Sequence, residues 1–206
     1  MLLIRDTLAV FVRAPVAGRV KTRLAVVLGP GRAAAIYRRM GRQVVAACVY
    51  PARHHTAVWF SPRRSRSQVE SWLGGLGVDR FLAQPGGGLG VRLSTVFERH
   101  FREGADRVVV IGSDCPEVRH QIVARSLLAL GDHDVVLGPA HDGGFYLLGL
   151  KAHCPALLRD IVWSTPAVLD QTLANAAGLR LDVRFLPVLR DVDTIVDARA
   201  LNLVDR

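Results

Sequence analysis

The sequence predicts an α/β protein with an open, mostly parallel β-sheet and helices on both faces of that sheet. Strand-like runs alternate with helix-like runs along the 206 residues, an order typical of parallel sheets that are covered on two sides. The run Val108–Ile111 is aliphatic throughout, as expected for a strand buried on both faces. Half of the residues are hydrophobic, which suits one domain, residues 1–206, with a sizeable core.

Each expected element follows from its own pattern. Short apolar and β-branched runs indicate strands, and apolar residues at every third or fourth position indicate helices. The expected strands are Thr7–Val12, Thr56–Phe60, Arg80–Leu82, Arg107–Ile111, Asp134–Leu137, Phe145–Leu150 and Arg184–Leu189. The expected helices are Ala33–Cys48, Gln68–Leu73, Gly90–Phe101, Ile122–Leu130, Val168–Ala177 and Thr194–Val204. In such sheets ligands bind beyond the carboxyl ends of the strands, so the residues after each strand are the candidates for chemistry.

Composition favours an anionic ligand and argues against several classes of protein. The formal net charge is +9, which suits anionic partners, but nucleic acid is not expected because aromatic residues make up only 6% of the chain. No apolar run approaches the roughly 18 residues of a membrane span. Arg5 and Asp6 interrupt the first apolar run, which favours a strand over a signal peptide. Cys48, Cys115 and Cys154 lack metal or disulfide spacing, which favours a reducing cytoplasm.

The loop after the first strand, Arg13–Arg23, carries four cations and several turn-forming residues. Backbone N–H groups and cations in such a loop can hold phosphate, and a solvated basic loop is the alternative. It is not a Walker A loop, since two residues separate Gly18 from Lys21. Lys21 and Lys151 are the two lysines among 27 basic residues. Lys21 therefore stands out in a chain that uses arginine as its general cation.

Two further segments supply carboxylates after strands. Asp114 directly follows the most apolar strand, where a carboxylate can ligate Mg²⁺ or cap the next helix. Asp191 and Asp193 alternate in an extended segment and point to opposite sides, so one can face a metal while the other caps the final helix. Asp193 and Thr194 are both candidate caps, and the two interpretations stay open.

The segment His141-Asp142-Gly143-Gly144 lies between two expected strands. It is a turn signal in its own right, and the functional alternative is that the glycines let the backbone approach a ligand beside Asp142. Farther along, Ser164 or Thr165 before a proline favours a helix start, while Trp163 is a candidate for lining an acceptor pocket. Neither a nucleophile elbow nor a Gly-x-Gly-x-x-Gly loop after the first strand is present, which disfavours a covalent hydrolase and a dinucleotide oxidoreductase.

Five of these runs together resemble a known family. They are FVRAPVAGRVKTRLAVVLG, VVVIGSDCPEV, VVLGPAHDGGFYLLGL, WSTPAVLDQTL and DVDT. In this order, over nearly the whole chain, they resemble the DUF2064 family of glycosyltransferase-like proteins, which is distantly similar to the 2-phospho-lactate and molybdenum cofactor guanylyltransferases. The resemblance implies a GT-A-like nucleotide-diphospho-sugar transferase fold.

The resemblance also implies a role for each matching residue. The nucleotide and its phosphates would contact Arg13, Gly18, Lys21, Arg23, Gln84, Gly90 and Arg92. Asp114 and Asp193 would hold a divalent metal, and Asp142 and Lys21 would be catalytic. The acceptor side would include Gly143, Gly144, Trp163 and Ser164. The family usually has acidic residues at the positions of Gly88 and His141, and this chain departs from it there.

We therefore expect an enzyme that transfers a group from a nucleotide-activated donor to a small-molecule acceptor with Mg²⁺ or Mn²⁺, glycosyl transfer from a nucleotide sugar being favoured. Nucleotidyl transfer to a phosphorylated small molecule is the alternative reaction. A degenerate, non-catalytic nucleotide-binding protein and an RNA-binding protein are the rivals from other classes. A homodimer is left open.

Overall fold

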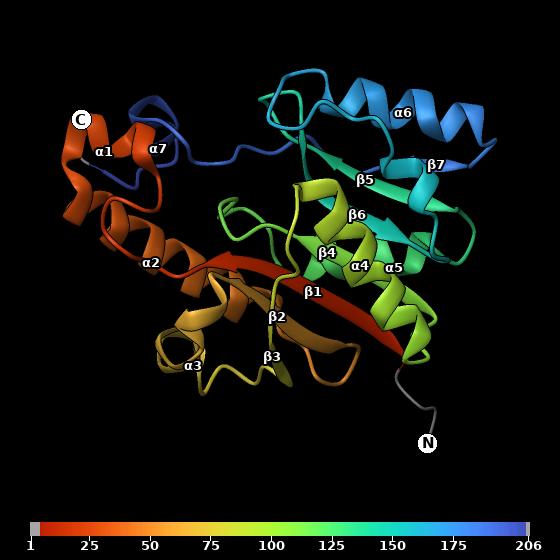
Figure 1. Cartoon of the computed structure of the whole chain (residues 1–206), viewed down its shortest axis with the longest axis horizontal. Coiled ribbons are helices and arrows are strands. Elements are labelled where there is room, and N and C mark those ends of the chain that lie inside the picture. Colours follow the sequence, from red (N-terminus) through yellow and green to blue (C-terminus); the bar gives the residue numbers. More distant parts are fainter. Residues whose placement is uncertain (1–4, 205–206) are drawn as a thin grey trace.

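The computed structural model describes residues 5–204, which form a seven-stranded sheet with the order β3-β2-β1-β4-β6-β5-β7 (Figure 1). The strands are β1 (Asp6–Arg13), β2 (His55–Ser61), β3 (Arg80–Ala83), β4 (Arg107–Ile111), β5 (Val135–Pro139), β6 (Phe145–Leu150) and β7 (Val183–Phe185). β6 runs antiparallel to β4 and β5, and the other neighbouring strands are parallel.

Helices cover both faces of this sheet. They are α1 (Thr22–Leu28), α2 (Pro30–Cys48), α3 (Arg66–Leu73), α4 (Leu89–Arg102), α5 (His120–Ala129), α6 (Val168–Gly178) and α7 (Ile195–Ala200), with short 3₁₀ turns η1 (Arg63–Ser65) and η2 (Pro155–Leu158). Side chains of β1 alternate between two cores. Leu8 and Val10 join the core under α2, α3 and α5, and Ala9 joins the core under α4 and α6. The fold class predicted from the sequence is confirmed.

Local departures from the predicted elements have physical reasons. α1 was not expected, because Leu24 is its one buried side chain and it shows no apolar period. The last strand is shorter than predicted, since Pro187 has no N–H to donate to a ladder. The last helix is also shorter: Thr194 caps its start, and Asn202 beyond its end has a left-handed φ of 52°. α6 begins at Val168, so the helix start predicted at Ser164 or Thr165 is wrong.

The sheet brings the predicted motifs to one edge. The parallel strands β1, β3 and β4 end there, at Arg13, Ala83 and Ile111. β6 is antiparallel, so its beginning, and with it the turn before Phe145, lies at the same edge. β7 is parallel to β5 and sends the segment with Asp193 in the same direction.

His100 of α4 is a buried, neutral histidine far from these loops. Its Nε2 accepts a hydrogen bond from Nε1 of Trp59 at 3.0 Å, and its ring packs edge-on against the indole. Burial lowers the pKa of His100 to about 4, although the Glu103 carboxylate partly opposes the shift. Between the folded pKa of about 4 and the ordinary pKa of 6.5, the unfolded chain therefore binds up to one more proton than the folded chain.

We predict that the free energy of unfolding falls as the pH is lowered from about 6.5 to about 4, with His100 contributing on the order of 2 kcal/mol of that loss. Urea unfolding at pH 7 and pH 5 measures it. The His100→Gln variant retains an acceptor for Trp59 but cannot be protonated, so its pH dependence should be shallower than that of the wild type. Equal pH dependence in the two proteins would contradict the assignment.

Candidate active site

A cavity of about 950 Å³ opens at the sheet edge where the motifs meet. Eleven of the residues singled out from the sequence line it: Arg13, Lys21, Arg23, Gln84, Arg92, Asp114, Asp142, Gly144, Trp163, Ser164 and Asp193. Gly18, Gly90 and Gly143 do not. Of the two positions that depart from the family pattern, Gly88 lies in the lining and His141 does not.

Lys21 forms the centre of the site. Its Nζ donates to Oδ1 of Asp193 at 2.7 Å and to Oδ2 of Asp114 at 3.1 Å, and the side chain is only 7% exposed. The backbone of Lys21 is left-handed, with φ 47° and ψ 50°, a conformation that costs a side-chain-bearing residue on the order of 1 kcal/mol. A compact ammonium on a flexible stem can reach two carboxylates in this narrow space, which the planar fork of arginine suits less well.

Lys21 and Asp114 stabilise each other in the ionised state. Burial alone would lower the pKa of Lys21, but the carboxylates of Asp114 and Asp193 more than offset this and raise it. In turn the Lys21 ammonium lowers the pKa of Asp114. Lys21 is therefore a cation and Asp114 an anion at neutral pH.

Asp191 lines the cavity together with Asp193, so the prediction that these two residues point to opposite sides is wrong. Burial, the neighbouring carboxylates Asp142 and Asp114, and more weakly Asp193, raise the pKa of Asp191 to about 6. The cavity thus holds four carboxylates. Four cations line the same cavity, Arg13, Lys21, Arg23 and Arg92, and of these Lys21 and the mostly exposed Arg23 pair with Asp193, at 2.7 and 3.9 Å.

Neither predicted metal carboxylate serves as a helix cap. α5 begins at His120 after Arg119, so Asp114 does not cap it. α7 is capped by Thr194, whose side chain accepts from the backbone N–H of Asp197 in a reciprocal capping box. The capping alternatives for Asp114 and Asp193 are therefore wrong, and both side chains face the cavity.

Asp114 and Asp193 suit a divalent cation as two ligands of a coordination shell that is otherwise open to water and substrate. Within residues 5–204, no group of three or more His, Cys, Asp and Glu side chains is arranged as a metal centre. Mg²⁺ is typically held by one or two carboxylates together with water and substrate phosphates. Asp114 and Asp193 are each about two-fifths exposed, at 41% and 42%, so both carboxylates remain accessible to a ligand in the cavity.

The Asp142 turn has a structural function and also faces the cavity. Oδ1 of Asp142 accepts from the backbone N–H of Gly144 at 2.9 Å. Gly143 has φ 86°, and a Cβ at this position would collide with the backbone of Pro166. Gly143 is thus needed for the turn to pack against the segment before α6, and for this residue the turn interpretation holds. Asp142 and Gly144, in contrast, line the cavity.

Gln84 and Arg92 form a fixed polar pair in the cavity lining. Nε2 of Gln84 donates to the carbonyl oxygens of Trp59 and Val12 at 2.9 and 3.2 Å. Because both amide hydrogens are used, Oε1 is directed to Arg92, which donates to it at 3.2 Å. Gly90 acts indirectly: a Cβ there would lie 2.7 Å from Nε1 of Trp163, so this glycine lets the indole approach α4.

Tyr37 joins two of the loops and was missed by the sequence interpretation. Its hydroxyl accepts from the backbone N–H of Arg13 at 2.9 Å and shares a second hydrogen bond of 2.9 Å with Oγ of Ser113. The loop after β1 is therefore tied to the loop that presents Asp114. Tyr37 occupies a core position of the amphipathic helix α2, and nothing in the sequence distinguishes it from an ordinary core aromatic residue.

The fold has the architecture of the GT-A-like nucleotide-diphospho-sugar transferases. The chain is 33% identical to a protein from Desulfovibrio desulfuricans G20 that carries the provisional name nucleotide-diphospho-sugar transferase, with a TM-score of 0.89 over 97% of this chain and 87% of the other. The DUF2064 family, described as an uncharacterized protein conserved in bacteria, matches residues 44–165. The chain belongs to the DUF2064 family.

More distant structures share the fold. A nucleotidyl transferase from Methanothermobacter is 19% identical, with a TM-score of 0.58 over 96% of this chain and 95% of the other. A mannosyltransferase from Pyrobaculum calidifontis in complex with GDP-Man and Mn²⁺ is 15% identical, with a TM-score of 0.55 over 91% of this chain and 56% of the other. No curated protein matches the chain.

We predict that Lys21→Met lowers the free energy of unfolding by about 2 kcal/mol at pH 7. Removing one partner of a buried ion pair typically costs about 3–5 kcal/mol, and partial exposure of both aspartates reduces that figure. The loss should shrink on acidification, because protonated carboxylates no longer need a cation.

Lys151→Met is the matched control. Lys151 is the other lysine, and it forms a half-exposed pair with Asp134, so its replacement should cost less than about 1 kcal/mol. Urea unfolding of both variants at pH 7 and pH 4.5 measures the difference. If the two variants lose the same free energy of unfolding, and lose it equally at both pH values, the central position of Lys21 is refuted.

Proposed function

We propose that the chain is a metal-dependent transferase that uses a nucleotide-activated donor, and that it transfers a glycosyl group from a nucleotide sugar to a small-molecule acceptor. The transferase class is borne out by the relative from Desulfovibrio desulfuricans G20, and the fold is shared with the nucleotidyl transferase from Methanothermobacter. The observation that carries the proposal is the cluster of Lys21, Asp114 and Asp193 on the wall of an open cavity of about 950 Å³. That volume suits a ligand of nucleotide-sugar size.

In this proposal Asp114 and Asp193 hold Mg²⁺ or Mn²⁺. When bound, the ion would neutralise charge on the leaving diphosphate. Lys21 orients the two aspartates and supplies a permanent positive charge beside them. Arg13 and Arg23 line the same cavity and would bind phosphate oxygens. Support comes from the accessible carboxylates of Asp114 and Asp193, which suit a cation, and from the basic loop, which suits an anionic donor.

The remaining residues would bind the two ends of the substrates. Gln84 and Arg92 are held in fixed orientations by their own hydrogen bonds, so they would contact the base or ribose without reorganising. On the other side, Gly144, Trp163 and Ser164 would shape the acceptor site, with Gly143 supporting the wall from behind. Asp142 lies beside them, and its Oδ2 would accept the proton of the attacking acceptor hydroxyl.

Nucleotidyl transfer is the alternative reaction for the same cavity. An acceptor phosphate would then attack the α-phosphorus of a nucleoside triphosphate, and pyrophosphate would leave. The cations of the first loop suit a triphosphate as well as a sugar diphosphate. The released product separates the two reactions, because glycosyl transfer yields a nucleoside phosphate and nucleotidyl transfer yields pyrophosphate. A chain that binds donor with metal but releases neither product would instead be a degenerate, non-catalytic binding protein.

We place this activity in the cytoplasm. Within residues 5–204 the three cysteines are free thiols, two of them buried, as expected in a reducing compartment. No helix in that range is long and apolar enough to cross a bilayer.

We predict that a nucleoside diphosphate or its sugar conjugate raises the melting temperature only when Mg²⁺ or Mn²⁺ is present. A ligand that binds only the folded chain at about 100 times its Kd stabilises that chain by about 2.7 kcal/mol. A thermal-shift panel of the common nucleotides, with EDTA as the metal-free arm, measures this. No metal-dependent shift with any nucleotide would overturn the proposed function.

We predict that Asp114→Asn unfolds with near-wild-type stability but loses at least about tenfold in metal-dependent nucleotide affinity, because an amide is a poorer ligand than a carboxylate for a hard cation. The best nucleotide of the panel, titrated calorimetrically with and without metal, provides the readout. Asp132→Asn is the control, since Asp132 is exposed and lies outside the cavity. Normal metal-dependent affinity in Asp114→Asn would remove the metal role of Asp114.

A further inference from the structure

The positive charge of the chain is concentrated in its first third. Between Asp6 and Glu70 the sequence contains no acidic residue and twelve of the 27 lysines and arginines. Residues 7–69 therefore carry a formal charge of +12, and the rest of the chain carries −3. Genomic base composition can bias the choice of arginine over lysine, but it does not separate cations from anions along a chain.

These cations are on the surface and mostly lack anionic partners. All eleven arginines of residues 7–69 are exposed. Two of them form ion pairs, Arg23 with Asp193 and Arg66 with Glu70, and the other nine have no ion pair to any residue of the described range 5–204. Elsewhere in that range, half of the fourteen lysines and arginines are paired. Unpaired like charges repel one another, so such a surface suits a polyanionic partner.

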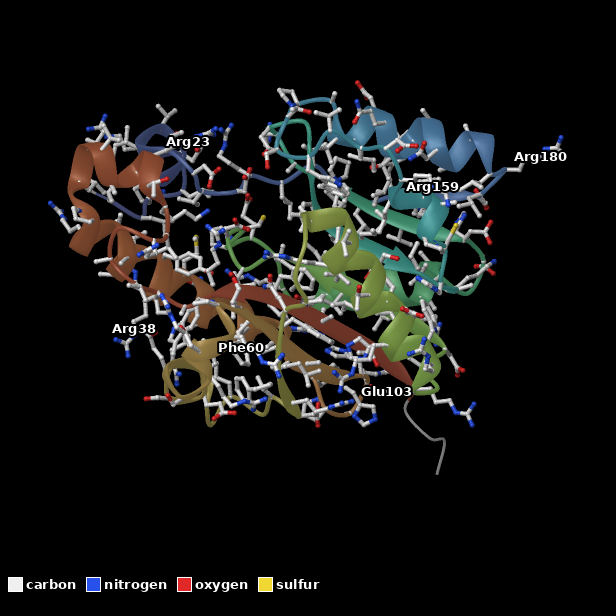
Figure 2. All side chains as sticks on the ribbon, viewed as in Figure 1. Arg23, Arg38, Phe60, Glu103, Arg159 and Arg180 are labelled. Atoms are coloured by element: carbon white, nitrogen blue, oxygen red, sulfur yellow. The ribbon has the colours of Figure 1, made fainter. Side chains whose placement is uncertain are left out.

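Most of these arginines lie outside the proposed active site. Arg13 and Arg23 line the cavity, and the remaining nine do not. Arg32, Arg38, Arg39 and Arg42 occupy the solvent face of α2, opposite its buried face, and Arg63 and Arg64 lie in η1 before α3. Figure 2 shows Arg38 projecting into solvent at the end of the molecule formed by α1, α2 and α3, far from Arg180 at the other end. We call this surface of α1, α2 and η1 the basic face.

The basic face also exposes aliphatic side chains. In α1, Val26 is 85% exposed and Val27 is 58% exposed. α7 packs beside α1 (Figure 1) and adds Val196, which is also exposed. Aliphatic side chains flanked by arginines are typical of helices that lie in a bilayer interface, where the apolar groups enter the acyl boundary and the cations meet phosphates. Single-stranded nucleic acid would instead require exposed aromatic stacking platforms, and Tyr50 is the one large aromatic residue exposed in this segment.

We propose that the basic face docks the protein reversibly on an anionic membrane surface, with the arginines of α2 and η1 against lipid phosphates and the valines of α1 in the interface. α1 directly continues the loop with Arg13, Lys21 and Arg23, so docking places one wall of the cavity close to the bilayer. This binding is independent of the transferase proposal, since the two use different residues.

Flotation with lipid vesicles tests the proposal on the full chain. The wild type should bind vesicles of phosphatidylcholine with phosphatidylglycerol, should not bind phosphatidylcholine alone, and should dissociate at about 0.5 M salt, where charges are screened within a few ångströms. A quadruple variant removes four cations whose side chains make no hydrogen bond or ion pair within residues 5–204: Arg32→Gln/Arg38→Gln/Arg63→Gln/Arg64→Gln. This variant should bind the anionic vesicles at least about tenfold more weakly than the wild type.

The matched control changes net charge equally at a different place. Arg125→Gln/Arg159→Gln/Arg180→Gln/Arg184→Gln removes four exposed cations outside residues 7–69 and should bind vesicles like the wild type. Val26→Ser/Val27→Ser should weaken vesicle binding while retaining the melting temperature, because both side chains are exposed. Failure of the wild type to bind anionic vesicles would overturn the proposal, as would equal effects of the two arginine variants.

A polyuridylate titration forms the last arm. Two results together would assign the basic face to nucleic acid and overturn the membrane proposal. The first is RNA affinity that falls in the variant of Arg32, Arg38, Arg63 and Arg64. The second is vesicle binding that is unchanged in the valine variant. Metal-dependent nucleotide binding should be retained in all three variants, so a failure of the membrane proposal leaves the transferase proposal standing.

Discussion

The ion pairs between the Lys21 ammonium and the carboxylates of Asp114 and Asp193 are the constraint on which the arrangement of the site depends. The three residues come from the ends of β1, β4 and the chain beyond β7, which are separated by 93 and 172 positions in the sequence. A buried ammonium must be paired, and the only way to pair it here is to bring these loops together. The backbone of Lys21 accepts a left-handed conformation to make that contact.

The tight turn between β5 and β6 contributes to this convergence. β5 has the same direction as β4 and ends at the edge where β1 and β4 end, so the turn with Asp142 that follows β5 lies at that edge. This turn joins the loops after β1 and β4, and β7, parallel to β5, returns the chain to the same edge. Tyr37 then ties two of these loops through one hydroxyl. The cavity is thus assembled by topology, and the ion pairs fix its final geometry.

The fold could be predicted from the sequence because burial leaves a periodic signature. The run Val108–Ile111 indicates its strand directly, and α2 and α4 show clear apolar faces. The site could be predicted only in part. Lys21, Asp114 and Asp193 have charged side chains and follow strands, so their location at one edge of the sheet can be predicted. The ion pairs among them depend on how the loops pack in three dimensions, which no local pattern in the sequence indicates. No local pattern in the sequence indicates α1, because it has one buried side chain. The same is true of the role of Tyr37, because its ring occupies an ordinary core position of α2.

The same ion pairs bear on how a divalent cation could enter the site. Lys21 pairs with one oxygen of each aspartate. The second oxygens are Oδ1 of Asp114 and Oδ2 of Asp193, and the latter lies 3.9 Å from the exposed Arg23. A cation approaching from the cavity would be repelled by Lys21 and the arginines of the lining and attracted by the carboxylates of Asp142 and Asp191. Binding of an anionic diphosphate would tilt this balance toward the cation, because its oxygens complete the coordination that two aspartates cannot supply. Donor and metal are therefore expected to bind cooperatively, each weakly without the other.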